Sequence, residues 1–360
     1  MTIETTKQSY FRFKWPSMNP ILIKELRSRM RGPRAFMILT GFLLLLSAVA
    51  LFFYFTMAET QRFNSASISW SAMIGVSMFM GIAFFELFLV AFITPALTAG
   101  TISGEREALT FEMLIATPLR PASILVGKML ATLSYVFLLI FAAVPMFSLV
   151  YIFGGVTWDD MLIALLVLVV TTITFGAIGM FWSTMLGKTS RATVMSYLSV
   201  ITLIIGPLIA TILWGILKQQ TPPPAFSYLN PFNAMLSVIS IGIDNGFALF
   251  DNPMYFFFAL LGGNIMFGTS SLPLSHPAWH WTLSFYTLIT LFLSILTVFF
   301  VRPAGHRRPS VPQALLTLVL ILVVLGSMSL IFSPNDWQEI WMSPDDPRFF
   351  SQQTRELLLM

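Results

Sequence analysis

The stretch AFMILTGFLLLLSAVALFFYFT, residues 35–56, contains no charged residue and decides the fold class. A helix that crosses the hydrocarbon core of a bilayer needs about 20 predominantly apolar residues in sequence. The stretch lacks the alternation that marks a transmembrane β-strand. Six further stretches have the same character, with no Lys or Arg in their interiors: residues 70–93, 130–152, 161–183, 193–217, 281–301 and 312–333. The sequence therefore predicts an all-α polytopic membrane protein with about seven transmembrane helices.

The composition of the whole chain agrees with this class. Hydrophobic residues make up 56% of the 360 residues and charged residues 10%, whereas an ordinary soluble domain is about 25% charged. There is no Cys, which excludes disulfides, thiolate chemistry and Cys-ligated metals. The net charge of +4 gives no basis for binding nucleic acid. The apolar core of a signal peptide is about 7–15 residues near the very start, so we expect residues 35–56 to remain a membrane span.

The placement of Lys and Arg predicts the orientation, because cytoplasmic connections carry an excess of these residues. Sixteen of the 20 Lys and Arg residues fall on one side: they precede the first span or lie between spans two and three, four and five, or six and seven. The other four lie on the opposite side. We therefore expect a multi-pass protein of the cell's inner or plasma membrane. The predicted parts are a cytoplasmic N-terminal segment 1–34, a transmembrane domain 35–333 and an external tail 334–360.

The external connection, residues 218–280, is strongly apolar in two places. Residues 231–243 and 254–268 are each short for a span and are bounded by Pro, Gly and Asn. We interpret them as re-entrant or interfacial helices on the outer end of the bundle. The alternative is a second hairpin of short spans, which would leave the orientation unchanged.

Residues 19–34, NPILIKELRSRMRGPR, predict an amphipathic helix that ends at Gly32-Pro33. On a helical wheel Lys24, Arg27 and Arg31 share the face opposite to the apolar side chains. This pattern is typical of a helix that lies in the membrane interface with its cations against anionic lipid headgroups. It is either a topology anchor alone or also a contact for a cytoplasmic partner.

The cytoplasmic connection between spans two and three, residues 94–128, is far longer than a hairpin needs. Ser103 could cap a helix whose first turn carries Glu105 and Glu107, where carboxylates favour the helix dipole. On a helical wheel Glu105 and Glu112 share a face with Leu109, whereas a membrane-surface helix would separate its charged and apolar side chains. Two interpretations remain open, a helix inserted into a groove of another protein and a structured loop without a partner.

Several motifs of the first half resemble the permease subunits of type-2 ABC exporters. They are NP-x₄-E-x-R at residues 19–27, GERE-x-LTFE-x-L-x₂-TPL at residues 104–119 followed by Gly127-Lys128, and GGVTWDD at residues 154–160. The resemblance covers residues 19–160, and the later spans match in topology. The seventh span and the external tail depart from the pattern of the family.

This resemblance implies a six-helix permease core that works as a dimer, with itself or a paralogue, beside two cytoplasmic ATPase subunits. In the family the connection after the second helix forms a coupling helix that docks in a groove of the ATPase. Carried over to this sequence, the docking residues would be Glu105, Arg106, Glu107, Thr110 and Glu112.

Two further features could be functional. Glu86 is the one acid well inside a predicted span, and an ionisable residue at that depth suggests a function by default. A packing hydrogen bond or a neutral acid is the plainer interpretation. Gly187-Lys188-Thr189 imitates the end of a P-loop, but that motif needs an earlier Gly where this chain has Trp182, and a preceding strand. We therefore expect no nucleotide binding, no cofactor, no metal and no enzymatic activity in this chain.

The most favoured function is thus the membrane pathway of an ABC exporter, whose ATP hydrolysis takes place in a partner subunit. One alternative is an integral membrane enzyme or scaffold that acts on lipids without an ATPase, which should gather acids, His or Arg at one membrane face. Another is a stand-alone secondary transporter, which should show inverted repeats and charges at the midplane.

Overall fold

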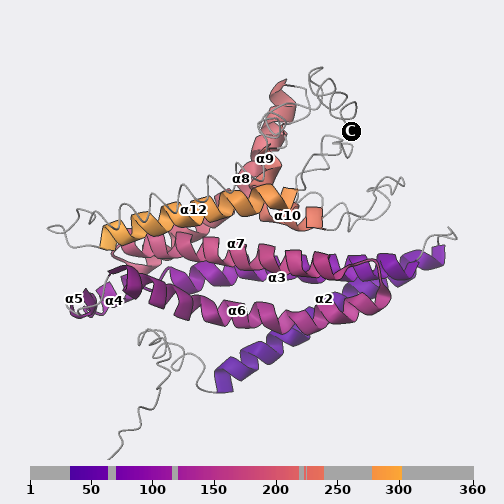
Figure 1. Cartoon of the computed structure of the whole chain (residues 1–360), viewed down its shortest axis with the longest axis horizontal. Helices are drawn as coiled ribbons and strands as arrows, with labels where there is room; N and C mark the ends of the chain where they lie inside the picture. The colour runs from indigo at the N-terminus through magenta and orange to yellow at the C-terminus, as the bar shows by residue number, and fades with distance from the viewer. Residues whose placement is uncertain are drawn as a thin grey trace, which may run out of the picture.

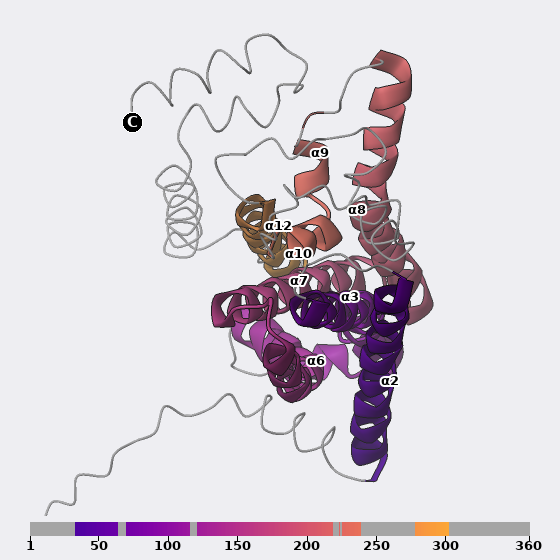
Figure 2. The same ribbon diagram turned by 90° about the vertical axis from the view of Figure 1, so that its right-hand side faces the viewer.

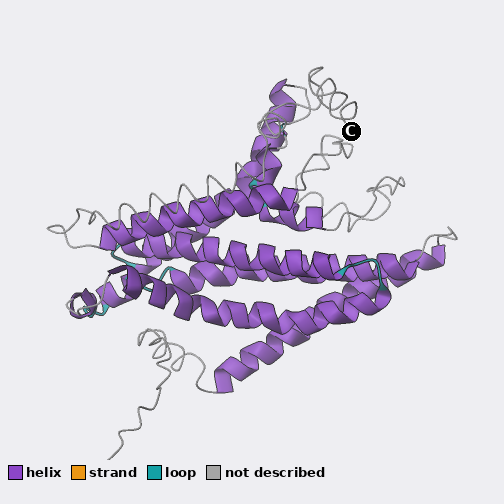
Figure 3. Cartoon of the chain, viewed as in Figure 1, coloured by secondary structure: helices purple, strands orange, loops and turns teal. Residues whose placement is uncertain are grey.

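The computed structural model describes residues 33–63, 70–115, 121–218, 223, 225–238 and 278–301. Every regular element within these ranges is a helix (Figure 3). Six helices are long: α2 (Pro33–Phe63), α3 (Trp70–Thr98), α6 (Pro121–Phe153), α7 (Trp158–Met185), α8 (Thr189–Lys218) and α12 (Ala278–Val301). Four are short: α4 (Ser103–Glu107), α5 (Phe111–Ile115), α9 (Ala225–Tyr228) and α10 (Pro231–Val238).

The six long helices are each long and apolar enough to cross a membrane. They confirm the first six predicted spans and extend several of them. Helix α3 continues beyond 93 to Thr98, and α6 begins at Pro121 rather than at 130. Three other predicted features lie outside the described residues: the seventh span 312–333, residues 19–32 of the interfacial helix with Lys24, Arg27 and Arg31, and the tail 334–360. The last two residues of the segment 19–34 are the first two of α2.

Helices α3 and α7 form the centre of the bundle. Within their most apolar windows 72% and 61% of residues are buried, against 17% in α8 and 22% in α2. Helices α3, α6, α7 and α12 run lengthwise together, whereas α8 leaves the bundle at an angle (Figure 1). Seen from the end of the bundle, α2 and α8 occupy the same flank (Figure 2). Among the described residues, α2 and α8 therefore expose many of their apolar side chains.

Glycines on α7 let its neighbours approach closely. A Cβ at Gly179 would lie 2.9 Å from the Cβ of Thr98 on α3, and one at Gly176 would lie 2.8 Å from the Cδ2 of Leu133 on α6. Both separations are too short for real atoms. Small residues at such positions are what bring membrane helices together, because lipid offers no hydrophobic drive between them. The core of the bundle thus depends on α7.

The turn between α6 and α7 contains Gly154 and Gly155, with φ of +83° and +81°. Both angles lie in the left-handed region, where only Gly is free of a steric penalty. Helix α7 then begins with a capping box, in which the Thr157 hydroxyl accepts from the Asp160 amide and the Asp160 side chain accepts from the Thr157 amide. The predicted GGVTWDD motif is therefore a tight helix-to-helix connection.

Helices α9 and α10 pack against the start of α12, and α10 also contacts the middle of α3. Phe232 of α10 lies against Phe84 of α3, with ring centroids 5.5 Å apart. The Tyr286 hydroxyl of α12 donates to the Leu229 carbonyl at 3.1 Å. Helix α10 covers only the first eight residues of the predicted segment 231–243. The rest of that segment and residues 254–268 lie outside the described residues, so their re-entrant arrangement stays a prediction.

Candidate functional site

The connection between α3 and α6 contains two short helices, where the sequence suggested one. Helix α4 ends at Glu107 and α5 begins at Phe111. Between them Leu109 has a φ of 58°, and the Thr110 amide donates to the Glu105 carbonyl at 3.0 Å. The chain therefore folds back on itself at Leu109. A left-handed residue ends a helix, which is why a single helix does not run through residues 103–115.

The start of α4 is fixed by α7 rather than by its own side chain. The expectation that Ser103 caps α4 is wrong, because the N-cap residue is Ile102 and no side-chain cap bond forms there. The amides of Ile102 and Ser103 donate to the Ser183 hydroxyl oxygen, at 2.9 and 3.0 Å. The Ser103 hydroxyl donates to the Ala99 carbonyl at 2.8 Å. Ser183 thereby satisfies two helix-start amides that would otherwise lack a partner.

Glu107 connects α4 with the start of α8. Its carboxylate accepts from the Thr189 amide at 2.9 Å and from the Thr189 hydroxyl at 2.8 Å. Thr189 is the first residue of α8. A carboxylate at a helix N-terminus satisfies a free amide and interacts favourably with the helix dipole. Gly187-Lys188-Thr189 is accordingly the turn between α7 and α8, with a helix and no strand before it.

Glu105 connects α4 with α6 through an ion pair with Lys128. The Lys128 side chain is 5% exposed and that of Glu105 is 27% exposed. Lys128 lies within α6 and is buried, not in a free loop as its sequence position suggested. An ion pair removed from water is costly to break on one side, since the remaining charge is left without compensation. Glu105 and Lys128 therefore hold α4 against α6.

Arg106 connects α4 with α5. Its guanidinium carbon lies 4.8 Å from the centroid of the Phe111 ring. A cation over an aromatic face is attracted by the ring quadrupole. This contact adds a side-chain link between the two short helices.

The side chains that remain exposed gather on the turn itself. Leu109 is 84% exposed and Met113 is 74% exposed, and Thr110 and Glu112 are exposed beside them. We refer to residues 108–113 as the exposed turn. Large apolar side chains in water are unfavourable unless another surface covers them. The five residues predicted for docking thus divide. The side chains of Glu105, Arg106 and Glu107 contact other side chains or the backbone of other helices, whereas Thr110 and Glu112 lie on the exposed turn, where the Thr110 hydroxyl donates to the Glu105 carbonyl at 3.3 Å.

Glu86 lies in the middle of α3 and is 1% exposed. Neither of its carboxyl oxygens has a hydrogen-bond partner among the described residues. The structure thus places Glu86 in the packed interior and away from the exposed turn, and the packing hydrogen bond considered from the sequence is not observed. Within the described residues no three His, Cys, Asp or Glu side chains come together as a metal site would require.

Three residues of the site were missed by the sequence reasoning: Lys128, Ser183 and Thr189. Each contacts α4 across a long sequence separation, 23 residues for Lys128 and about 80 for the other two. Lys128 offered one signal, as it is part of the Gly127-Lys128 pair that carries the resemblance. Ser183 offered none, because a Ser inside an apolar span normally bonds its own helix.

The model of the ABC-2 family transporter proteins matches residues 19–300 of this chain. The match covers most of the sequence and all of the described helices except Val301. The chain therefore belongs to this family of ABC transporter permeases, and it is a multi-pass membrane protein with at least the six spans described above. No curated protein matches the chain.

Proposed function

We propose that this chain forms the membrane pathway of an ABC exporter and that its exposed turn is the contact for a separate cytoplasmic ATPase. In this proposal it works as a dimer, with itself or a paralogue, between two ATPase subunits. Membership of the permease family supports the membrane role. The observation that carries the ATPase contact is the pair of exposed apolar side chains, Leu109 and Met113, on a turn whose base is fixed to three helices.

The position of the turn supports a cytoplasmic contact. Helices α4 and α5 lie together at one end of the bundle (Figure 1). At the same end Ile102, Leu125, Met180 and Val301 form one apolar cluster. The end of α3, the start of α6 and the ends of α7 and α12 therefore meet there. This is the end that the distribution of Lys and Arg assigns to the cytoplasm, with the N-terminus on the same side.

The chemistry of the turn indicates what the ATPase must offer. Leu109 and Met113 need an apolar groove, and Met adapts its shape to such a surface. Glu112 needs a cation at the rim, because opposite charges give specificity and steer association. Phe111 is already engaged by Arg106 and so stiffens the turn from within.

The bonds at the base of the turn supply a route for the ATPase stroke. When ATP closes the ATPase subunits, a rigid docked turn moves with them. Glu107 passes that displacement to the start of α8, and Glu105 passes it to α6 through Lys128. A turn that was free to bend would absorb the motion instead. Glu105, Arg106 and Glu107 thus serve docking by positioning the residues that touch the partner.

A co-purification experiment tests the ATPase contact. The tagged chain is purified from its own cells in mild detergent, and an ATPase with a Walker A motif is sought by mass spectrometry and then quantified. We expect Met113→Asp and Glu112→Ala to reduce the ATPase that co-purifies, and Asp159→Ala, at the far end of the bundle, to leave it unchanged. Wild-type amounts of ATPase and full transport in both turn variants would refute the contact.

A further inference from the structure

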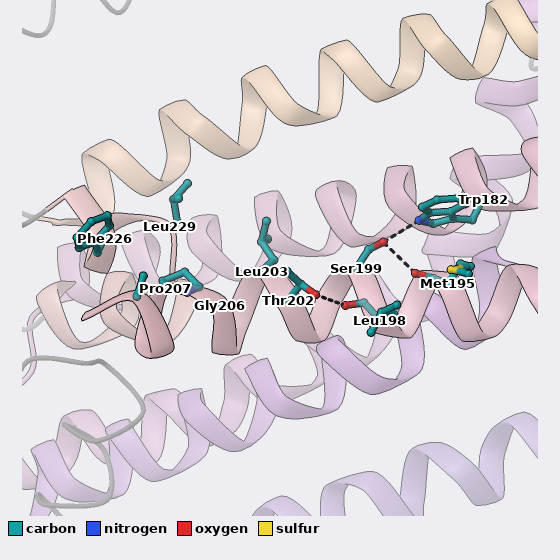
Figure 4. A pocket seen from close by; sticks show the side chains of 11 residues that line it. Trp182, Met195, Leu198, Ser199, Thr202, Leu203, Gly206, Pro207, Phe226 and Leu229 are labelled. Atoms are coloured by element: carbon teal, nitrogen blue, oxygen red, sulfur yellow. Dashed lines mark hydrogen bonds between the residues drawn. The ribbon is translucent and has the colours of Figure 1, made fainter. Parts of the chain in front are cut away.

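A long groove lies between the middle of α8 and the layer formed by α7 and α9. Its volume is 670 Å³ (Figure 4). Trp182 of α7 closes one end, and Phe226 of α9 and Leu229 close the other. The wall on α8 is formed by one face of the helix: Met195, Leu198, Ser199, Thr202, Leu203, Gly206, Pro207 and Ala210.

Two contacts join α8 to its neighbours, one at either end of this groove. The Trp182 indole donates to the Ser199 hydroxyl at 2.7 Å. Further along the helix, the ring of Trp214 meets that of Phe226 at 5.7 Å between centroids. Between these contacts a Cβ at Gly206 would meet only the Cγ2 of Thr202, at 3.6 Å, so the wall is open there.

The groove offers an occupant almost no polar side chain to bind. The Ser199 hydroxyl donates to the Met195 carbonyl at 2.9 Å and accepts from Trp182. The Thr202 hydroxyl donates to the Leu198 carbonyl at 2.8 Å. Both hydroxyls are therefore satisfied within the chain. An ion or a sugar would lose its hydration in the groove and gain nothing in return, which leaves an apolar occupant.

The groove follows the middle of α8, a helix that is long and apolar enough to cross a membrane. Residues 195–210 of a helix extend over about 22 Å at 1.5 Å per residue, less than the ~30 Å of the hydrocarbon core. Helix α8 also exposes apolar side chains on its neighbouring face, among them Ile201, Ile205 and Ile209. The groove is thus continuous with a surface that faces lipid hydrocarbon in the bilayer.

We propose that this groove binds one acyl chain of a bilayer lipid as a resident ligand between α8 and the α7–α9 layer. The length of the groove exceeds half the hydrocarbon core, about 15 Å, so it can hold the acyl chain of a lipid from one leaflet. The acyl chain fills space that the protein side chains leave open and keeps α8 at its angle. This site does not depend on the ATPase contact.

Photocrosslinking tests the proposal. The purified full-length chain is reconstituted into phosphatidylcholine vesicles that contain a trace of a phosphatidylcholine with a diazirine on one acyl chain. After irradiation the adducts are mapped by mass spectrometry. We expect several-fold more adducts on Leu203, Gly206 and Ala210 than on Ile201 and Ile205, because a bound chain stays near the groove longer than the lipids around the helix.

Variants that fill the groove complete the test. Gly206→Leu places a side chain in the open wall and should remove most adducts from the groove. Gly41→Leu on α2 is the matched control, because a Cβ at Gly41 meets no atom within 4 Å and Gly41 is exposed. If Gly206→Leu does not insert, Ala210→Met tests the same wall. Equal labelling of both faces of α8, or groove adducts that persist in the variant, would overturn the proposal.

Discussion

The carboxylate of Glu107 accepts two hydrogen bonds from Thr189, a residue 82 positions later in the chain. One residue ends α4 and the other begins α8, so this pair joins the connection after the second span to the start of the fifth. The same pair shows why two acids of the GERE motif that look alike have different roles. Glu105 meets a buried cation, whereas Glu107 caps a helix.

Replacement of Glu107 by Ala removes the acceptor for both bonds at the start of α8. We expect correct insertion, a modestly lower melting temperature in detergent and a clear loss of coupling between ATP turnover and transport. Thr189→Ala should give the same coupling defect through the other partner. The measurement is ATPase activity with and without transport in reconstituted vesicles. Normal coupling in both variants would show that the bonded pair is structural only.

Lys128 and Glu105 test whether the base of the turn depends on charge. Removal of Glu105 leaves the charge of Lys128, whose side chain is 5% exposed, without this carboxylate, and breaking a buried pair in this way costs about 3–5 kcal/mol. Glu105→Leu should therefore lower the melting temperature strongly. The double variant Lys128→Met with Glu105→Leu should recover much of it, since an apolar replacement of similar size can be nearly neutral. Additive losses in the double variant would contradict an interaction between the two side chains.

Leu109 separates stability from docking. A left-handed conformation costs a non-Gly residue about 1–2 kcal/mol, and Leu109 has a φ of 58° and an 84% exposed side chain. Leu109→Gly should thus raise the stability of the isolated permease while it weakens binding of the ATPase. Thermal unfolding and co-purification measure the two effects. A variant that gains both stability and ATPase binding would argue against Leu109 as a contact residue.

Gly179 tests the close packing of α7 on α3. A methyl group there would overlap Thr98, and overpacking of a core costs about 1–3 kcal/mol. We expect Gly179→Ala to lower the melting temperature and Gly41→Ala, which meets open space, to leave it unchanged or raise it. Unfolding followed by circular dichroism in detergent compares the two variants. Equal stability would mean that the α3–α7 contact relaxes without cost.

The orientation can be measured with single cysteines, because the chain contains no Cys. We predict that Lys7→Cys is protected from an impermeant maleimide in intact cells and that Gln352→Cys is labelled. This pattern follows from seven spans with a cytoplasmic N-terminus. Labelling at position 7, or protection at position 352, would defeat the seven-span model.

Hydropathy predicted the six described spans because each contains enough consecutive apolar residues to cross a membrane, whether they are buried or exposed. It placed the end of α3 too early and the start of α6 too late, because both helices continue past their apolar stretches. In α6 the buried Lys128 is tolerated through its ion pair with Glu105. The break at Leu109 could not be predicted, because Leu rarely adopts a positive φ and only the tertiary bonds of the turn impose it. The partners of Glu107 and of the α4 amides could not be predicted either, because they lie 80–82 positions later in the chain.

The long separation between α4 and its partners has a consequence for the order of biosynthesis. The hydrogen-bond partners of the α4 amides and of Glu107 lie 80–82 residues downstream, on α7 and α8. Chains are made from the N-terminus, so the ribosome must complete four spans and begin a fifth before the turn gains its base. Until then the turn has no fixed shape to offer. An ATPase that recognises that shape would ignore half-made permeases and join only chains whose bundle has assembled.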